Sequence, residues 1–212
     1  MTARCYHCGA KATTREHVPP KCMFPEGFRH NLITVPSCDR HNLAKTKDDE
    51  YLRSVLAVAP GNNTHCLGLL DGKILPSLDR RPHLVGTLFP ALQPLQVDGL
   101  ETAMFTLDRE RFERSVVAVA RGLFFHEYER RIAGEARVAW GPYLLGEPAE
   151  APFLDIVENA QHRLPPIDRG SNPEVFTYAI DRSTCSATWL CRLRFFQGHP
   201  VCIVWHEREA SP

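Results

Sequence analysis

The 212-residue sequence predicts an α+β fold, with short strands and a helix first, one long helix in the middle and an antiparallel three-stranded meander at the end. Three observations support this prediction. Cysteine and histidine pairs bracket a segment rich in Asn and Pro near the amino end. Apolar residues recur at helical spacing within 107–132. Three runs of β-branched and aromatic residues follow residue 173.

The first fifty residues predict two short strands followed by a helix. Residues 12–15 and 32–35 have the β-branched composition typical of strands. A helix is expected over 39–59, because it can begin near Ser37 or Asp39 and must end before the Pro-Gly pair that follows.

The middle of the chain predicts irregular structure and then one long helix. Four prolines interrupt residues 61–107, so we expect short strands and loops there rather than helices. Residues 107–132 form the clearest predicted helix. Its apolar stripe contains Phe112, Val116, Val119 and Leu123.

The last third of the chain predicts a short helix and three strands. A Pro- and Gly-rich stretch leads into a short amphipathic helix at 153–163, and residues 165–173 have loop composition. The strands of the meander are expected at 174–181, 187–196 and 201–206.

Composition excludes some classes of function. Lys plus Arg and Asp plus Glu both number 25, so no overall field attracts nucleic acid, which argues against a basic coating protein. The amino end has no apolar signal segment, and no apolar run is long enough to cross a bilayer. A cytoplasmic protein without a membrane partner is therefore expected. Its eight cysteines then indicate metal ligands and buried thiols rather than disulfides.

Two pairs of candidate metal ligands lie near the amino end. Cys5 and Cys8 enclose two residues, and so do Cys38 and His41. This spacing lets a tight turn point both ligand atoms at one ion, and two such turns complete the tetrahedron of a structural Zn²⁺. The sequence therefore predicts a structural zinc ion that holds a segment poor in apolar residues.

The residues around these pairs carry a family resemblance. Glu16-His17 follows the first pair and precedes two prolines, His30-Asn31-Leu32 precedes the second pair, and Asn42 follows His41. Taken together, CYHC, REHVPP, HNLITVPSC and CDRHNLAK resemble the HNH endonucleases, also called ββα-metal or His-Me finger nucleases. The resemblance covers residues 1 to about 55. It implies a zinc-stabilised ββα-metal module that hydrolyses phosphodiester bonds with a divalent cation, with DNA as the favoured partner.

The resemblance also implies a role for each site residue. His17 would be the general base, since the pKa of an imidazole lies near working pH, and Asn31 would orient its ring. Glu16 should point to the opposite face of the strand, because neighbouring side chains alternate. There it would hold Mg²⁺ or Mn²⁺ together with Asn42. The expected substrate-binding residues are Lys45, Arg15 and Arg40.

Three positions depart from the commonest family pattern. Glu16 stands where Asp is more usual, which leaves the metal preference open. Asn42 stands where many members have His, although other members carry Asn. His41 replaces a Cys of the second zinc pair, and zinc accepts either ligand.

The sequence predicts two domains and leaves the function open between three alternatives. Residues 1–60 would form the nuclease module, and residues 61–212 an α+β accessory domain that selects the substrate or mediates self-association, including as a homodimer. A metal-dependent DNA endonuclease, of the kind that can serve in restriction or phage defence, is favoured. One alternative is a zinc-stabilised nucleic-acid or protein binding module with a degenerate nuclease site. The other is an RNA endonuclease.

Overall fold

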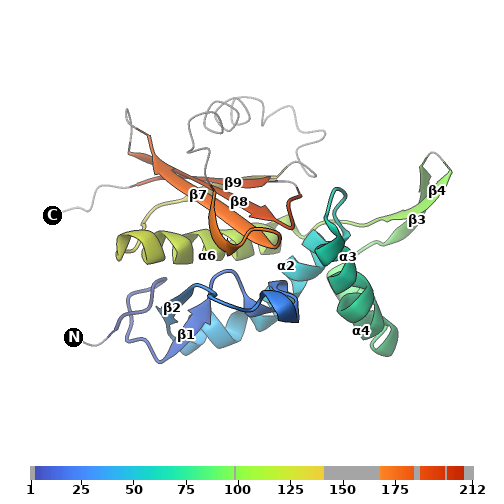
Figure 1. Cartoon of the computed structure of the whole chain (residues 1–212), viewed down its shortest axis with the longest axis horizontal. Coiled ribbons are helices and arrows are strands. Elements are labelled where there is room, and N and C mark those ends of the chain that lie inside the picture. Colours follow the sequence, from blue (N-terminus) through green and yellow to red (C-terminus); the bar gives the residue numbers. More distant parts are fainter. Residues whose placement is uncertain (1–2, 98, 141–167, 184–186, 199, 208–212) are drawn as a thin grey trace.

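The computed structural model describes residues 3–97, 99–140, 168–183, 187–198 and 200–207. Its main part has three layers, with helix α6 (Arg109–Tyr128) in the middle (Figure 1). A five-stranded antiparallel sheet lies on one side of α6. A two-stranded hairpin and helix α2 lie on the other side. The mixed α+β class predicted from the sequence is confirmed.

The amino-terminal hairpin pairs β1 (Thr14–His17) with β2 (Thr34–Ser37). The two predicted strands exist, but each lies two residues later in the chain than expected. Residues before β1 are used differently: Lys11 forms an isolated bridge with Arg4, which closes the first cysteine turn. β1 begins three residues after this bridge.

The helix predicted over 39–59 is divided. It consists of α1 (Asp39–Asn42), the 3-10 helix η3 (Leu43–Lys45) and α2 (Thr46–Val58). The irregular turn lies where the Asn42 amide donates to Thr14 and the Lys45 ammonium reaches Glu16. The change from α-helix to 3-10 helix and back therefore occurs where Asn42 and Lys45 contact β1. The end of α2 before Pro60 is as expected.

The prediction that residues 61–107 lack helices is wrong. The prolines occupy places that helices tolerate: Pro76 lies in the first turn of one helix, and Pro82 is the N-cap of the next. Strands appear only at the end of this region, as a hairpin that extends from the body (Figure 1). The elements are α3 (Thr64–Leu69), the π-helix η4 (Leu70–Ile74), α4 (Leu75–Arg80), α5 (His83–Leu88), β3 (Gln93–Val97) and β4 (Leu100–Met104).

The carboxy-terminal meander is confirmed and is part of a larger sheet. Its strands are β7 (Phe176–Arg182), β8 (Thr188–Phe195) and β9 (Pro200–His206). The sheet order is β5-β9-β8-β7-β6, so β5 (Ala136–Trp140) and β6 (Arg169–Asn172) were missed. β6 corrects the loop expected at 165–173. The helix predicted at 153–163 lies outside the described residues.

Both predicted domains contribute to one hydrophobic core. Tyr6 and Val35 from the hairpin region belong to the same buried cluster as Phe112, Leu123 and Trp205. The contact between α2 and α6 is also polar, because Asp48 pairs with Arg111 at 2.7 Å. The hairpin is therefore held against a larger scaffold, as an isolated two-stranded unit requires. The division at residue 60 stays a prediction.

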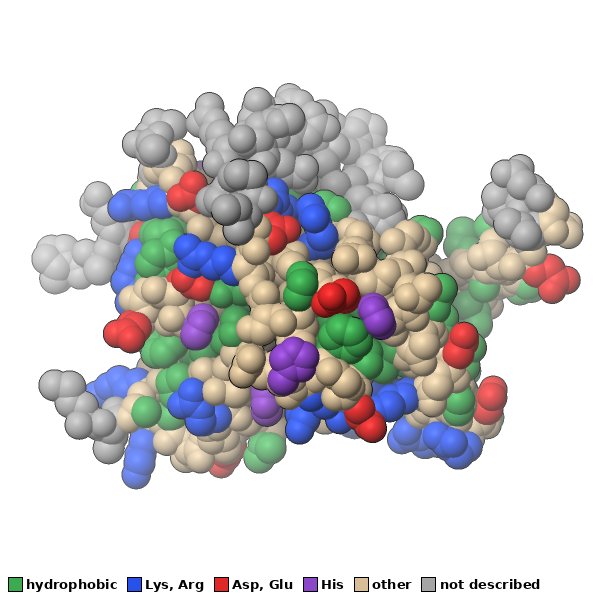
Figure 2. All heavy atoms as spheres, in the orientation of Figure 1, with side chains coloured by type: hydrophobic (Ala, Val, Ile, Leu, Met, Phe, Trp, Pro, Cys, Tyr) green, Lys and Arg blue, Asp and Glu red, His purple; other side chains and the backbone are tan. Residues whose placement is uncertain are grey.

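Charged side chains are mixed on the surface. On the face shown in Figure 2, Lys and Arg are interspersed with Asp and Glu rather than gathered in one patch. This agrees with the formal net charge of zero. Among the helices that the structure describes, none has the length and apolar character needed to span a membrane.

Gly122 is the point at which α6 touches the end of β1. A Cβ added to Gly122 would lie 2.7 Å from Cγ2 and 3.0 Å from Cγ1 of the buried Val18. We expect Gly122→Ala to destabilise the protein by about 1–3 kcal/mol, because this overpacking outweighs the gain in helix propensity. Chemical denaturation measures the change. Gly68→Ala is the control, since nothing lies within 4 Å of a Cβ there. Equal stabilities of the two variants would contradict the packing argument.

Candidate metal centre

Cys5, Cys8, Cys38 and His41 converge in the structure as the sequence predicts. Their ligand atoms all lie within 4.8 Å of one another. The Sγ atoms of Cys8 and Cys38 are 3.8 Å apart, and His41 Nδ1 lies 3.3 Å from the Cys38 Sγ and 3.8 Å from the Cys5 Sγ. Sulfur ligands about 2.3 Å from a tetrahedral zinc are themselves about 3.8 Å apart. The cluster therefore has the chemistry and dimensions to hold a zinc ion.

Two different turns supply these ligands. The Gly9 amide donates to the Cys5 carbonyl at 2.9 Å, and Gly9 adopts a φ of 75° that suits glycine. Cys38 is the N-cap of α1, and the His41 amide donates to its carbonyl at 2.9 Å. The first pair thus comes from a tight hairpin and the second from the first turn of a helix.

His7 links the cluster to α6. Its ring stacks on the ring of His41 with centroids 4.1 Å apart, and its Nε2 lies 3.2 Å from Nη1 of Arg121. Burial, followed by the nearby His41 and Arg121, lowers the pKa of His7 to about 4. His7 is therefore neutral at pH 7 and accepts the hydrogen bond from Arg121. Arg121 also donates to the Gly134 carbonyl. It therefore links the turn between Cys5 and Cys8 to α6 and to the segment that follows α6.

The two faces of β1 carry different side chains, as alternation predicts. Glu16 is only 4% exposed and faces the helical side, where the neighbouring Thr14 accepts a hydrogen bond from Asn42 at 3.0 Å. Arg15 and His17 lie on the other face and are more accessible. Glu16 and His17 therefore point to opposite sides of the strand.

His17 is half-buried at the carboxyl end of β1. Burial, and then the charge of Lys21, lowers its pKa below the ordinary value, so the neutral imidazole dominates at pH 7. The hydrogen bonds of the described residues leave its ring unpaired, and Asn31 is exposed with a φ of 50°. The predicted orientation of His17 by Asn31 stays a prediction.

Glu16 is surrounded by donors. Its carboxylate pairs with the Lys45 ammonium at 2.6 Å and accepts hydrogen bonds from Tyr6 and Ser37, each at 3.3 Å. Lys45 also pairs with Asp49 at 2.8 Å. Burial raises the pKa of both carboxyl groups, and Lys45 offsets part of that rise. Burial alone would lower the pKa of Lys45, but the two carboxylates raise it above its ordinary value, so the ammonium stays charged.

Glu16 and Asn42 do not form a ready site for a divalent cation in this arrangement. The Asn42 amide nitrogen donates to Thr14 and to the Arg15 carbonyl, and the Glu16 carboxylate is already bound by Lys45, Tyr6 and Ser37. Their predicted role as ligands of Mg²⁺ or Mn²⁺ therefore stays a prediction. The cysteine and histidine cluster fits zinc well, whereas Glu16 and Asn42, as they lie here, fit a divalent cation poorly.

The three expected substrate-binding residues differ in accessibility. Arg15 is exposed and donates to the hydroxyl and carbonyl of Thr34 at 3.0 Å. Arg40 is exposed on α1. Lys45 has a side chain that is 15% exposed and is held by the two carboxylates. On this geometry, Arg15 and Arg40 are exposed to a phosphate, although Arg15 also bonds Thr34, and Lys45 would first have to leave its partners.

Sequence reasoning missed four residues that support these groups: Tyr6, His7, Ser37 and Asp49. Asp49 could have been found, because it lies four residues after Lys45 on a predicted helix. Tyr6 and His7 lie inside the first knuckle, where the spacing draws attention to the cysteines alone. Nothing in the sequence pattern indicates that Ser37 points at Glu16.

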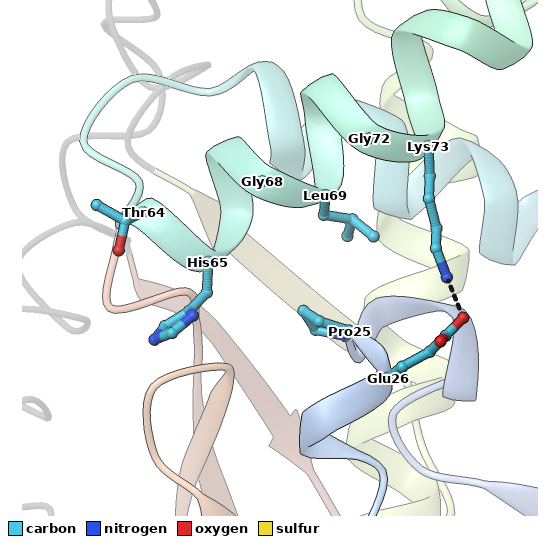
Figure 3. A pocket seen from close by; sticks show the side chains of 8 residues that line it. All are labelled: Pro25, Glu26, Thr64, His65, Gly68, Leu69, Gly72 and Lys73. Atoms are coloured by element: carbon cyan, nitrogen blue, oxygen red, sulfur yellow. Dashed lines mark hydrogen bonds and ion pairs between the residues drawn. The ribbon is translucent and has the colours of Figure 1, made fainter.

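A separate open pocket of about 410 Å³ lies between η2 (Glu26–Phe28) and the α3–η4 helices (Figure 3). Lys73 and Glu26 form an ion pair at 3.1 Å across it, and His65 and Leu69 lie along its wall. None of the residues predicted to carry chemistry lines this pocket. The metal cluster and the end of β1 remain the better candidate for function.

Thiol reactivity should distinguish the cysteines of the cluster from Cys66 and Cys191, which lie outside it. Burial raises the pKa of Cys66 to about 12 and that of Cys191 well above its ordinary value. At pH 8 about one Cys66 thiol in ten thousand is ionised, so alkylation of native protein should spare both cysteines. A chelator should expose Cys5, Cys8 and Cys38 to alkylation, as peptide mass spectrometry would detect. Equal labelling of the three ligands with and without chelator would contradict metal binding.

Comparisons with protein-family models, curated proteins and solved structures found no match to this chain. The structure does support a cluster compatible with a zinc-knuckle module. Any inference about the function of this protein therefore depends on the geometry of the cluster and on the residues around it.

Proposed function

We propose that this protein is an endonuclease that hydrolyses phosphodiester bonds, with DNA as its substrate. One observation carries the proposal. The chain forms a strand–strand–helix unit in which His17 ends the first strand and the helix begins within the metal cluster, at Cys38. This is the order of parts that the resemblance to HNH endonucleases implies.

The environment of His17 supports a role as general base. The neutral imidazole predominates at pH 7, its ring is half-buried, and the side of the strand on which it lies is accessible. A base of this kind takes a proton from water as the water attacks phosphorus. The buried partners of Glu16 hold the strand beneath His17. The exposed Arg15 supplies positive charge on the same face of the strand, and Arg40 is exposed on α1.

DNA is favoured over RNA because the structure supplies no stacking platform within its described part. The aromatic side chains of the large sheet are buried rather than displayed on its surface. They are Trp140, Phe176, Tyr178, Trp189, Phe195 and Trp205. A nuclease that positions the backbone phosphate through exposed arginines needs no such platform.

A zinc-stabilised binding module is the second candidate. The observation that favours it is the saturation of Glu16, which is 4% exposed and paired with Lys45. In this case the knuckle would bind a nucleic acid or a protein without cleaving it. Both candidates require zinc, so metal content does not separate them.

The test is cleavage by the zinc-loaded protein of supercoiled plasmid and of an RNA of matched sequence, with Mg²⁺, Mn²⁺ or EDTA. Conversion of the plasmid to nicked or linear form in Mg²⁺ or Mn²⁺ alone would support a metal-dependent DNase. Cleavage of RNA alone would change the substrate. Binding of either nucleic acid without cleavage in any metal would favour the binding module and contradict the endonuclease.

A further inference from the structure

The Glu16–Lys45–Asp49 triad is a buried charge cluster with an unusual balance. Two carboxylates face one ammonium, so one negative charge is uncompensated within the triad. All three side chains are largely enclosed, with exposed fractions of 5% for Glu16, 15% for Lys45 and 18% for Asp49. Buried charges of this kind are costly unless a cation lies between the anions. Lys45 lies there.

The Lys45 ammonium lies between the two carboxylates, where a metal cation bound by both would lie. Its Nζ lies 2.6 Å from an oxygen of Glu16 and 2.8 Å from an oxygen of Asp49. Mg²⁺ bonds oxygen at about 2.1 Å and is often held by one or two carboxylates and water. A small approach of the two carboxylates would therefore convert the ammonium position into a divalent one. The hydrogen bonds from Tyr6 and Ser37 to Glu16 are 3.3 Å each, so they restrain the carboxylate less than shorter bonds would.

We propose that Lys45 is the resident cation of the Glu16 carboxylate and that it keeps divalent metal ions from binding between Glu16 and Asp49. The ammonium and a divalent ion compete for the same oxygens, so metal binding requires Lys45 to move away. The role of this competition in catalysis rests on the proposed function, because a substrate phosphate is the group that would draw Lys45 away from the two carboxylates. The competition itself does not depend on cleavage.

The competition can be measured without nucleic acid. Mn²⁺ is titrated into the zinc-loaded protein by isothermal calorimetry, with free Mn²⁺ followed by electron paramagnetic resonance. Lys45→Met keeps the length and packing of the side chain and removes the charge. We expect it to bind one Mn²⁺ at least roughly tenfold more tightly than wild type, because the competing charge is gone and two carboxylates remain. Mn²⁺ should also raise its melting temperature more than that of wild type.

Two further variants make the result decisive. Lys47→Met removes an exposed lysine two residues later, in the first turn of α2, and should bind Mn²⁺ as wild type does. The double variant Glu16→Gln/Lys45→Met lacks both charges of the Glu16–Lys45 ion pair. It should lose the tighter Mn²⁺ binding and the Mn²⁺-induced rise in melting temperature, because one of the two carboxylates is gone. The proposal is overturned if Lys45→Met binds Mn²⁺ no better than wild type. It is also overturned if Lys45→Met stays unfolded in millimolar Mn²⁺ while the double variant folds. If the Mn²⁺ results are as expected but the wild-type protein does not cleave nucleic acid, the proposed function alone is contradicted.

Discussion

Cys38→Ser should abolish zinc binding and lower the melting temperature by about 10 °C or more, because structural zinc contributes directly to folding. Cys38 is both a ligand and the N-cap of α1, so its loss affects the cluster and the start of the helix together. The adjoining hairpin has only two strands, so it depends on the cluster as well as on the core against which it packs. Zinc content by atomic emission and thermal unfolding by circular dichroism would report the two effects.

Cys66→Ala is the matched control for this prediction. Cys66 is fully buried but lies outside the cluster, so the variant should lose some packing energy and keep one zinc ion per chain. A Cys38→Ser protein that retains both its zinc and the wild-type melting temperature would contradict the assignment of the cluster as structural.

His17→Ala should reduce the rate of phosphodiester cleavage by about 10²–10⁴-fold while zinc content and stability stay close to wild type, because it removes the general base. The half-buried ring has no hydrogen bond that its loss would break within the described structure. Single-turnover cleavage of a labelled duplex, measured beside zinc content, gives the rate.

The control for this change is His30→Ala, since His30 is exposed and its carbonyl, rather than its ring, accepts a hydrogen bond from Asn172. It should cleave as wild type does. The pH profile adds a second criterion. Because burial and Lys21 lower the pKa of His17, wild-type cleavage should fall with acidification only below about pH 6.5. Equal rates for His17→Ala and His30→Ala would exclude His17 as the base.

Much of the fold could be predicted because its signals are local. The apolar stripe around Phe112 and Val116 defines a helix by period alone, and α6 follows it. The alternation after residue 173 defines the meander in the same way. The zinc cluster was predicted because the spacing within each pair, Cys5-Cys8 and Cys38-His41, is a local signal, and four ligands complete one tetrahedral site.

What was missed depends on context that a sequence pattern does not contain. Residues 61–107 contain helices despite their prolines because a proline breaks a helix only in its interior. Pro82 is the N-cap of α5, and Pro76 lies in the first turn of α4, directly after the π-helix η4. β5 pairs with the distant β9, a partnership invisible to local composition. Lys45 was expected to reach a phosphate, but an ammonium near two buried carboxylates pairs with them first.

The most direct measurement is a zinc titration of cleavage. Protein stripped of metal would be reconstituted with increasing zinc up to one equivalent, and plasmid cleavage measured at each step for wild type and His17→Ala. We expect the wild-type rate to rise in proportion to bound zinc and His17→Ala to stay inactive throughout. Cleavage that is independent of zinc, or equal in the two proteins, would contradict a zinc-held module that acts through His17.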